Sequence, residues 1–230
     1  MNIQFPDNLF KFTGNKAKFD YIVKEGKKIC KDKKVFFCGV IRNGGQALEK
    51  NISRCIETAK AFKDFSIFIY ENDSTDNTKS ILDANKSEKV KFLSESRQDK
   101  DYIHKVETSE DPFHYHRCCV IADCRNKYVE YIENNNINDE YDYICVLDFD
   151  IAGGWSYEGF YHSIYMLECV DDAACMSAYG VLADYTHTKD LESVDSSKYL
   201  FFDSFAFRPL DKNPKIHKNQ TAYFNPIQYN

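Results

Sequence analysis

The chain has few of the residues that separate domains or break secondary structure. Its 230 residues include 5 prolines and 9 glycines, and they form no Pro/Gly/Ser-rich linker that would divide the chain. With 43% hydrophobic and 15% aromatic residues, a chain of this length can bury one sizeable core. We therefore expect a single domain over residues 1–230, and the sequence would also suit one domain of a longer, multi-domain enzyme.

Patterns that direct a chain to secretion or into a membrane are also missing. Residues 1–6 lack the charged-then-apolar order of a secretory signal, and no apolar run is long enough to cross a bilayer. The 9 cysteines show no repeated C-x-x-C spacing, and Cys38, Cys145 and Cys175 fall within apolar, strand-like runs. We interpret these three as reduced core residues and predict a cytoplasmic protein without a transmembrane segment.

The chain has no excess of positive charge. The formal net charge is −6 and no strong basic run is present, which argues against a nucleic-acid-binding surface. An anionic substrate would therefore need cationic side chains placed locally at its binding site.

The most informative stretch is the segment Tyr141–Ile151, YDYICVLDFDI. Its apolar run, Tyr143–Leu147, is too short for a typical helix and rich in β-forming residues, which predicts a fully buried, central strand. Asp148 and Asp150 follow this strand. Alternate strand residues share one side, so the two carboxylates can converge on one cation while Phe149 turns into the fold.

The chemistry of this D-F-D sequence has two readings. Hard carboxylate oxygens suit Mg²⁺ or Mn²⁺, which would make Asp148 and Asp150 metal ligands. Acids after strands also begin ordinary turns, so a lone D-x-D carries little weight. Its placement at the carboxyl end of a strand favours the metal, because open α/β sheets bind their ligands there.

Two β-then-α units precede this segment. The strand Val35–Ile41 stops at Arg42-Asn43-Gly44-Gly45, and apolar residues then recur at helical spacing between residues 48 and 62. The strand Ser66–Tyr70 is followed by the polar loop Glu71–Thr78 and a second helix. With a short third strand at 90–93, the order predicts an α/β fold with a mostly parallel, twisted sheet flanked by helices.

The loop after the second strand mixes structural and functional candidates. Thr75 or Asp76 can cap the following helix, and acids suit its positive end, so most of the cluster can be explained by capping. Glu71 stands at the strand end before the cap, where a carboxylate can accept a hydrogen bond from a base or a ribose hydroxyl. Right-handed crossovers would bring Arg42, Glu71 and Asp148 to one edge of the sheet.

The remaining segments offer further candidates. A helix over residues 113–133 carries Arg125 on its predicted buried stripe, where either a structural carboxylate or a ligand diphosphate could pair with the guanidinium. Trp155 follows two glycines and could either stack against a sugar ring or pack into the core. A helix is expected at Tyr157–Cys169 and a buried strand at Ala173–Tyr179.

The segment Phe202–Arg208, FDSFAFR, places an acid and an arginine among aromatic residues. An ionised Asp203 in such surroundings needs a partner, which is either Arg208 or a ligand. As a functional residue, Asp203 would be a catalytic carboxylate that orients or deprotonates an acceptor hydroxyl.

These motifs, in this order, resemble those of nucleotide-sugar glycosyltransferases of the GT-A fold. The segment 70–78, YENDSTDNT, is similar to the family's D-D-G-S-T-D-G-T signature, although Glu71-Asn72 replaces its paired aspartates. Residues 122–126 resemble the helical A-R-N segment, and Leu147–Asp150 resembles the D-x-D motif. Phe202–Arg208 is similar to the D-[ST]-F-A-x-R segment of the fungal capsule-associated mannosyltransferase group.

The resemblance implies a metal-dependent transfer of a sugar from a nucleoside diphosphate-sugar to a hydroxyl of a glycan or glycoconjugate. It implies a nucleotide-binding half at 35–150, an acceptor-side half at 151–230 and an amino-terminal extension at 1–34. Mn²⁺ or Mg²⁺ would be held by Asp148 and Asp150. The donor-binding residues would be Arg42, Asn43, Glu71, Asn72, Asp73, Arg125 and Asp148, and Asp203 would be catalytic.

Three alternatives share parts of this pattern. A sugar-phosphate nucleotidyltransferase has the same architecture and metal chemistry, but Arg42-Asn43-Gly44-Gly45 poorly matches the glycine-rich, basic loop expected of one. An aspartyl phosphatase also uses D-x-D, but its strand normally leads the domain and is followed by Thr or Val, whereas Ala152 stands here. A non-catalytic nucleotide- or glycan-binding domain would keep the same fold.

Overall fold

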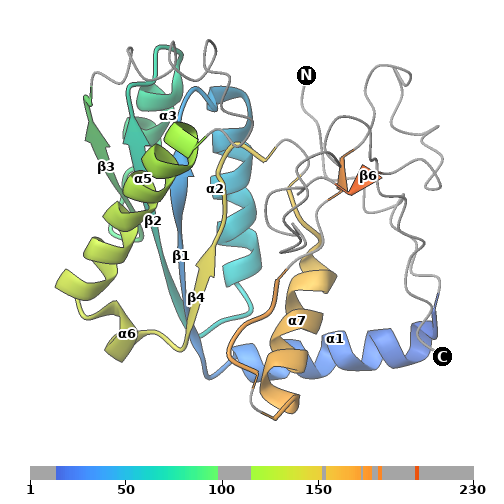
Figure 1. Cartoon of the computed structure of the whole chain (residues 1–230). Helices are drawn as coiled ribbons and strands as arrows, with labels where there is room; N and C mark the ends of the chain where they lie inside the picture. The colour runs from blue at the N-terminus through green and yellow to red at the C-terminus, as the bar shows by residue number, and fades with distance from the viewer. Residues whose placement is uncertain are drawn as a thin grey trace.

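The structure of the protein is a computed structural model that describes residues 14–97, 115–151, 154–171, 173–177, 181–182 and 200–201. The central element is a parallel sheet of four strands in the order β3-β2-β1-β4 (Figure 1). Its strands are β1 (Lys34–Ile41), β2 (Asp64–Asn72), β3 (Val90–Glu95) and β4 (Tyr143–Val146). The expected α/β class with a parallel sheet is therefore confirmed.

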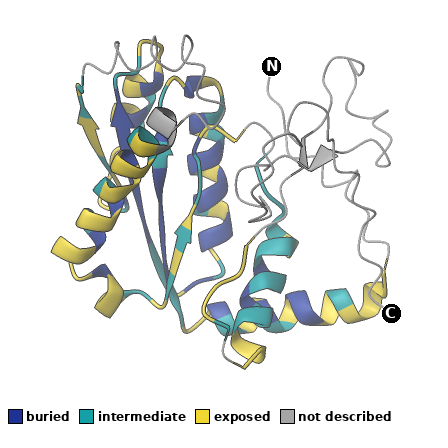
Figure 2. Ribbon diagram, in the orientation of Figure 1, coloured by how far each residue is buried: buried dark blue, intermediate teal, exposed yellow. Residues whose placement is uncertain are grey.

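Alternation along β1 and β2 divides the core into two layers. Val35, Phe37 and Ile41 pack into one cluster together with the helices α2 (Gly45–Ala59) and α3 (Thr78–Asn85). Phe36 and Cys38 face the opposite side, against α5 (Tyr115–Asn134) and α6 (Ile137–Glu140). β1 and β2 are mostly dark blue, and therefore buried, in Figure 2, because helices cover both faces of this parallel sheet.

Two further helices extend the first layer. α1 (Lys16–Cys30) packs against α7 (Tyr157–Cys169) at the side of the sheet (Figure 1). The contact is close at Gly26, where an added Cβ would lie 2.0 Å from the carbonyl oxygen of Tyr161. A short antiparallel pair, β5 (Val181–Leu182) and β6 (Leu200–Phe201), forms a second sheet. Of the helices in the described ranges, none is long and apolar enough to cross a membrane.

Several expectations about the strands are corrected by the structure. β4 is not a fully buried central strand, because it stands last in the sheet order and leaves Ile144 40% and Val146 53% exposed. β2 extends to Asn72, so Glu71 belongs to the strand and not to the loop. Residues 173–177 form no strand, and Cys175 is exposed instead of lying in the core.

The expected position of Arg125 on the buried side of α5 is also wrong. Over residues 119–134, where the side chains of this helix are described, the buried residues are Cys124, Tyr128 and Ile132, and Arg125 lies on the exposed side. The spacing of these three residues gives one narrow stripe, and Arg125 lies about 100° around the helix from Cys124. Its guanidinium is therefore partly solvated and its surroundings differ from those of a core arginine.

Candidate functional site

The carboxyl ends of β1 and β2 are joined by hydrogen bonds between the loops that follow them. Asn43 adopts a left-handed conformation (φ 52°), its N–H donates to Ser74 Oγ at 3.0 Å, and its Oδ1 accepts from the Thr75 N–H at 2.7 Å. The parallel register pairs Ile41 with Glu71, so both loops leave the sheet at the same level. The predicted meeting of these loops at one edge is confirmed.

Asp76 connects the amino-terminal ends of two helices. Its Oδ1 accepts from the Thr78 N–H at 3.0 Å within α3, and its Oδ2 accepts from the Gly45 N–H at 3.0 Å at the start of α2. Burial alone would raise the pKa of Asp76, but the hydrogen bonds from Thr78 and Gly45 outweigh it and the pKa is lowered. The N-cap residue of α3 is Asn77, whose side chain makes no capping bond, and not Thr75 or Asp76 as predicted. Asp76 instead accepts from the first N–H group of each of the two helices.

The D-x-D segment continues along β1 after β4 ends. The Leu147 N–H donates to Cys38 O at 2.9 Å, and the Phe149 N–H donates to Val40 O at 3.4 Å. Gly39 makes this approach feasible, since an added Cβ would lie 1.7 Å from the Leu147 carbonyl oxygen. Phe149 is fully buried as predicted, which directs Asp148 and Asp150 away from the core.

Asn51 on α2 holds the backbone on both sides of Asp150. Its Nδ2 donates to Phe149 O and to Ile151 O, both at 2.9 Å, and the residue is fully buried. The sequence analysis did not single out Asn51. The available signal was a polar residue between Leu48 and Ile52, on the apolar side of a predicted helix.

Asp148 and Asp150 form a carboxylate pair with one cation beside it. Burial raises the pKa of Asp150, and repulsion from the Asp148 carboxylate raises it further, although Asp150 keeps an exposed surface. An Nη atom of Arg125 lies 3.4 Å from Asp148 Oδ1, with both side chains about half exposed. Arg125 was predicted to pair with either a carboxylate of the protein or a ligand diphosphate, and in the structure it pairs with the Asp148 carboxylate.

The residues present fit a divalent cation that is bound partly by its substrate. Among the residues that the structure describes, no cluster of three or more His, Cys, Asp or Glu side chains could hold a metal alone. Mg²⁺ and Mn²⁺ are commonly bound by one or two carboxylates, with waters and substrate phosphates as the other ligands. Asp148 and Asp150 supply such a pair, and a cation between them would relieve the repulsion that raises the pKa of Asp150.

Glu71 lies at this edge, but its carboxylate is fully buried and bonded within the protein. Oε1 accepts from the Ser74 N–H at 2.7 Å, Oε2 accepts from the Ser94 hydroxyl, and Lys79 Nζ lies 3.9 Å away. Direct contact with a nucleoside would require Glu71 to leave these partners. In the structure it acts on the conformation of the loop that begins at Asp73.

Asn72 and Asp73 are similarly engaged. Asn72 is 5% exposed, and its Oδ1 accepts a hydrogen bond from Cys124 Sγ at 3.5 Å on α5. Asp73 has a positive φ of 51° and accepts from the Arg97 N–H at 3.0 Å, beyond the end of β3. These bonds join the ends of β2 and β3 and the helix α5 next to the predicted nucleotide site.

Arg42 differs from the other predicted site residues because part of its hydrogen-bonding capacity is unused. Its Nε atom is buried, and no described residue accepts a hydrogen bond from it. The residue directly follows β1, at the carboxyl edge of the sheet. A buried guanidinium donor without an acceptor is costly, so this position favours an acceptor that is not part of the described chain.

Two other candidates have different outcomes. Trp155 donates from Nε1 to Thr58 Oγ1 at 3.1 Å and packs against the core, which supports its structural reading. Asp203 and Arg208 lie outside the described residues, so their roles stay predictions of the sequence.

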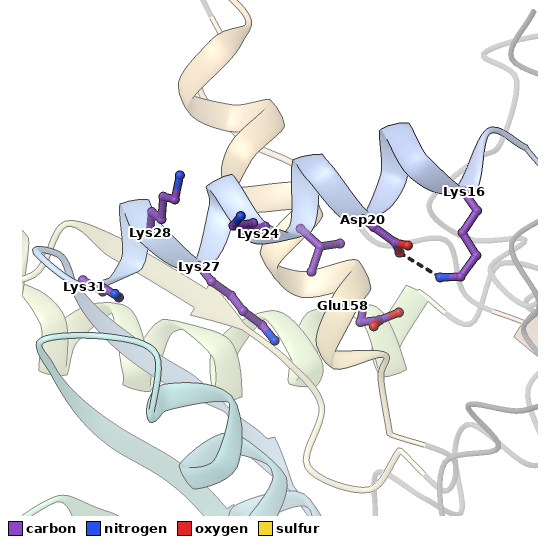
Figure 3. Close-up of a pocket in the computed structure, with 8 residues that line it drawn as sticks. Lys16, Asp20, Lys24, Lys27, Lys28, Lys31 and Glu158 are labelled. Atoms are coloured by element: carbon purple, nitrogen blue, oxygen red, sulfur yellow. Dashed lines mark hydrogen bonds and ion pairs between the residues drawn. The ribbon is translucent and has the colours of Figure 1, made fainter.

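A hollow on the described surface lies away from this edge. It measures about 620 Å³ and lies along α1 and the start of α7 (Figure 3). Its lining contains Lys16, Lys24, Lys27, Lys28 and Lys31, with Asp20, Glu158 and Val23. α1 ends shortly before β1 begins, which puts its carboxyl end near the opposite, amino-terminal edge of the sheet. We assign no substrate to this hollow.

Comparisons of the chain with protein-family models, with curated proteins and with solved structures find no match.

Proposed function

We propose that this protein is a metal-dependent glycosyltransferase that moves a sugar from a nucleoside diphosphate-sugar to a hydroxyl of a glycan or glycoconjugate. The observation that carries the proposal is the pair Asp148 and Asp150, placed at the carboxyl edge of a parallel sheet with Arg125 beside it. This is the edge at which open α/β sheets bind nucleotides. The motif resemblance to GT-A enzymes supports the same reading.

In this proposal the leaving diphosphate is the group that needs stabilisation. A Mn²⁺ or Mg²⁺ ion, when bound, supplies the positive charge that offsets the negative charge on the departing diphosphate. Asp148 and Asp150 hold the ion, and Asn51 keeps their backbone in place through Phe149 and Ile151. Arg42 donates to a phosphate oxygen through its Nε atom, which has no partner among the described residues.

The other predicted residues act around this centre. Arg125 neutralises Asp148 in the free protein and can turn to the diphosphate, because it is about half exposed. Asn43 and Asp73 shape the loops against which the nucleoside would lie, and Glu71 fixes those loops from within. Asp203 remains the proposed acceptor-side carboxylate. The proposal also retains a cytoplasmic location.

The test is an incubation with a panel of nucleotide-sugars and MnCl₂, with nucleoside diphosphate, pyrophosphate and inorganic phosphate measured separately. Release of nucleoside diphosphate is expected, and it should be abolished by excess chelator and by Asp150→Asn. Asp148→Asn should reduce it strongly. Asp83→Asn is the matched control, because Asp83 is an exposed acid on α3 away from this edge.

The products distinguish the alternatives. A parallel incubation with nucleoside triphosphates and sugar phosphates would identify a nucleotidyltransferase by release of pyrophosphate, and release of inorganic phosphate would identify a phosphatase. Nucleotide binding without any turnover would identify a binding domain. Undiminished turnover in Asp150→Asn would refute the assignment of the carboxylate pair.

A further inference from the structure

Lys50, in the second turn of α2, carries a charge that none of the described residues balances. Its side chain is partly buried, and its Nζ atom is enclosed without a hydrogen bond or an ion pair to the described part of the chain. Burial, and then repulsion from Arg54, lower the pKa of Lys50. An ammonium group taken out of water without a partner is costly, and most buried charges in proteins are paired for this reason.

The neighbouring cation increases this imbalance. Arg54 lies one turn further along α2 and is 8% exposed. Its Nε donates to Trp155 O at 2.7 Å, and its guanidinium lies 4.3 Å from the centre of the Tyr157 ring. Gly154 (φ 72°) lies so close that an added Cβ would be 2.8 Å from Arg54 Cδ. Arg54 is therefore held in place, and its positive charge stays near Lys50.

The position of Lys50 relates it to the carboxylate pair. The next residue in the helix, Asn51, is bonded to the backbone on both sides of Asp150, at Phe149 O and Ile151 O. The start of the same helix also touches Asp150, since an added Cβ on Gly44 would lie 3.0 Å from Asp150 Cβ. Lys50 thus belongs to the part of α2 that packs against the D-x-D segment.

We infer that Lys50 binds a phosphoryl oxygen of the donor diphosphate, next to the cation held by Asp148 and Asp150. This inference rests on the proposed function. A diphosphate carries more negative charge than one divalent ion neutralises, and an ammonium on a flexible stem is suited to bind the remainder. Arg54 contributes positive potential from a fixed position. The site predicted from the sequence did not include Lys50, because a lysine within a helix has no distinctive sequence signal.

The experiment uses inorganic pyrophosphate as the probe, titrated calorimetrically into the full chain with and without MnCl₂. Lys50→Met should weaken pyrophosphate binding by about tenfold or more, the scale of a lost charged hydrogen bond. Lys50→Arg should recover part of that loss. The matched control is Lys60→Met, because Lys60 lies at the other end of α2 and is exposed and paired with Glu57.

Thermal stability provides a second readout that does not depend on turnover. Removing an unpaired buried charge should leave the melting temperature of Lys50→Met unchanged or raised, whereas a lysine that supports the fold would lower it. Pyrophosphate should raise the melting temperature of the wild type more than that of Lys50→Met. Equal pyrophosphate affinity in the two proteins would overturn the inference.

The outcomes also separate this inference from the proposed function. Binding of MnCl₂ alone should be lost in Asp150→Asn and retained in Lys50→Met. If Asp150→Asn loses metal-dependent turnover while Lys50→Met binds pyrophosphate normally, only the role of Lys50 is refuted. If Lys50→Met loses pyrophosphate binding but neither Mn²⁺ nor Asp150→Asn affects it, Lys50 binds the anion and the metal-dependent transferase is refuted.

Discussion

Replacing Glu71 with alanine should destabilise the protein before it affects ligand binding. The change leaves the Ser74 N–H and the Ser94 hydroxyl without their acceptor. A hydrogen bond to a charged group contributes about 1.5–3 kcal/mol, so two would total about 3–6 kcal/mol. Ser94 is exposed and can bond to water, and the Lys79 contact at 3.9 Å adds little because Lys79 is 45% exposed. We therefore expect a loss of about 2–4 kcal/mol in the free energy of unfolding.

Glu71→Gln provides the internal comparison. The glutamine amide keeps the shape of the side chain, its oxygen can still accept from the Ser74 N–H, and its NH₂ can donate to a rotated Ser94 hydroxyl. Its cost should therefore be about 1 kcal/mol, the contribution of a neutral hydrogen bond. Glu88→Gln, at an exposed position, is the control for the removal of a negative charge.

Urea denaturation followed by circular dichroism measures the stability of each variant, and calorimetry with a nucleoside diphosphate measures binding at a temperature where all are folded. Folded Glu71→Ala should retain most of its nucleotide affinity, because both carboxylate oxygens are bonded within the protein, to Ser74 and Ser94. If Glu71→Ala is as stable as the wild type and loses nucleotide binding, the buried, structural role is wrong and the carboxylate contacts the nucleoside directly.

Two further substitutions test the support of the D-x-D backbone and the packing of α7 against α1. Asn51→Leu removes the donor to Phe149 O and Ile151 O, so the free energy of unfolding should fall by about 1–3 kcal/mol. Titration with Mn²⁺ should also show weaker binding. Unchanged stability and metal affinity would show that Asn51 does not hold the D-x-D segment. Burial lowers the pKa of His162, which stacks on Phe19 at 5.3 Å. Its contribution is therefore complete above the unfolded pKa of about 6.5 and is lost as pH falls through the lower folded value. His162→Phe should reduce the stability difference between about pH 7.5 and about pH 5 in urea titrations, and an identical pH dependence in the variant would contradict this.

Much of the fold between residues 34 and 97 followed from the sequence itself. The near-continuous apolar runs at 35–41 and 66–70 predicted the strands β1 and β2, and the helical spacing of apolar residues from 48 to 62 predicted α2. The loops after these strands had to lie at one edge because parallel strands joined by right-handed crossovers end on the same side. Asp148 was placed at that edge by the same reasoning, before any contact was known.

The tertiary structure decided which of those side chains remain accessible to a ligand. A pattern of burial along the chain specifies a face but not the partner that covers it, and partners come from distant segments. Glu71 is closed off because Ser94, at the next strand end, supplies a donor to it. Arg125 is exposed because the apolar stripe of α5 is narrower than the sequence suggested.

Residues in helices were the hardest to predict, since their function depends on what the helix packs against. Asn51 holds the D-x-D backbone because that segment lies against its turn of α2. Lys50 became a candidate because no described residue accepts a hydrogen bond from its Nζ atom. β4 is an edge strand because its neighbour on one side is β1 and the described chain adds no strand on the other. The sequence by itself determined the local elements and the edge where they end, and long-range packing decided the pairing and burial of each charge there.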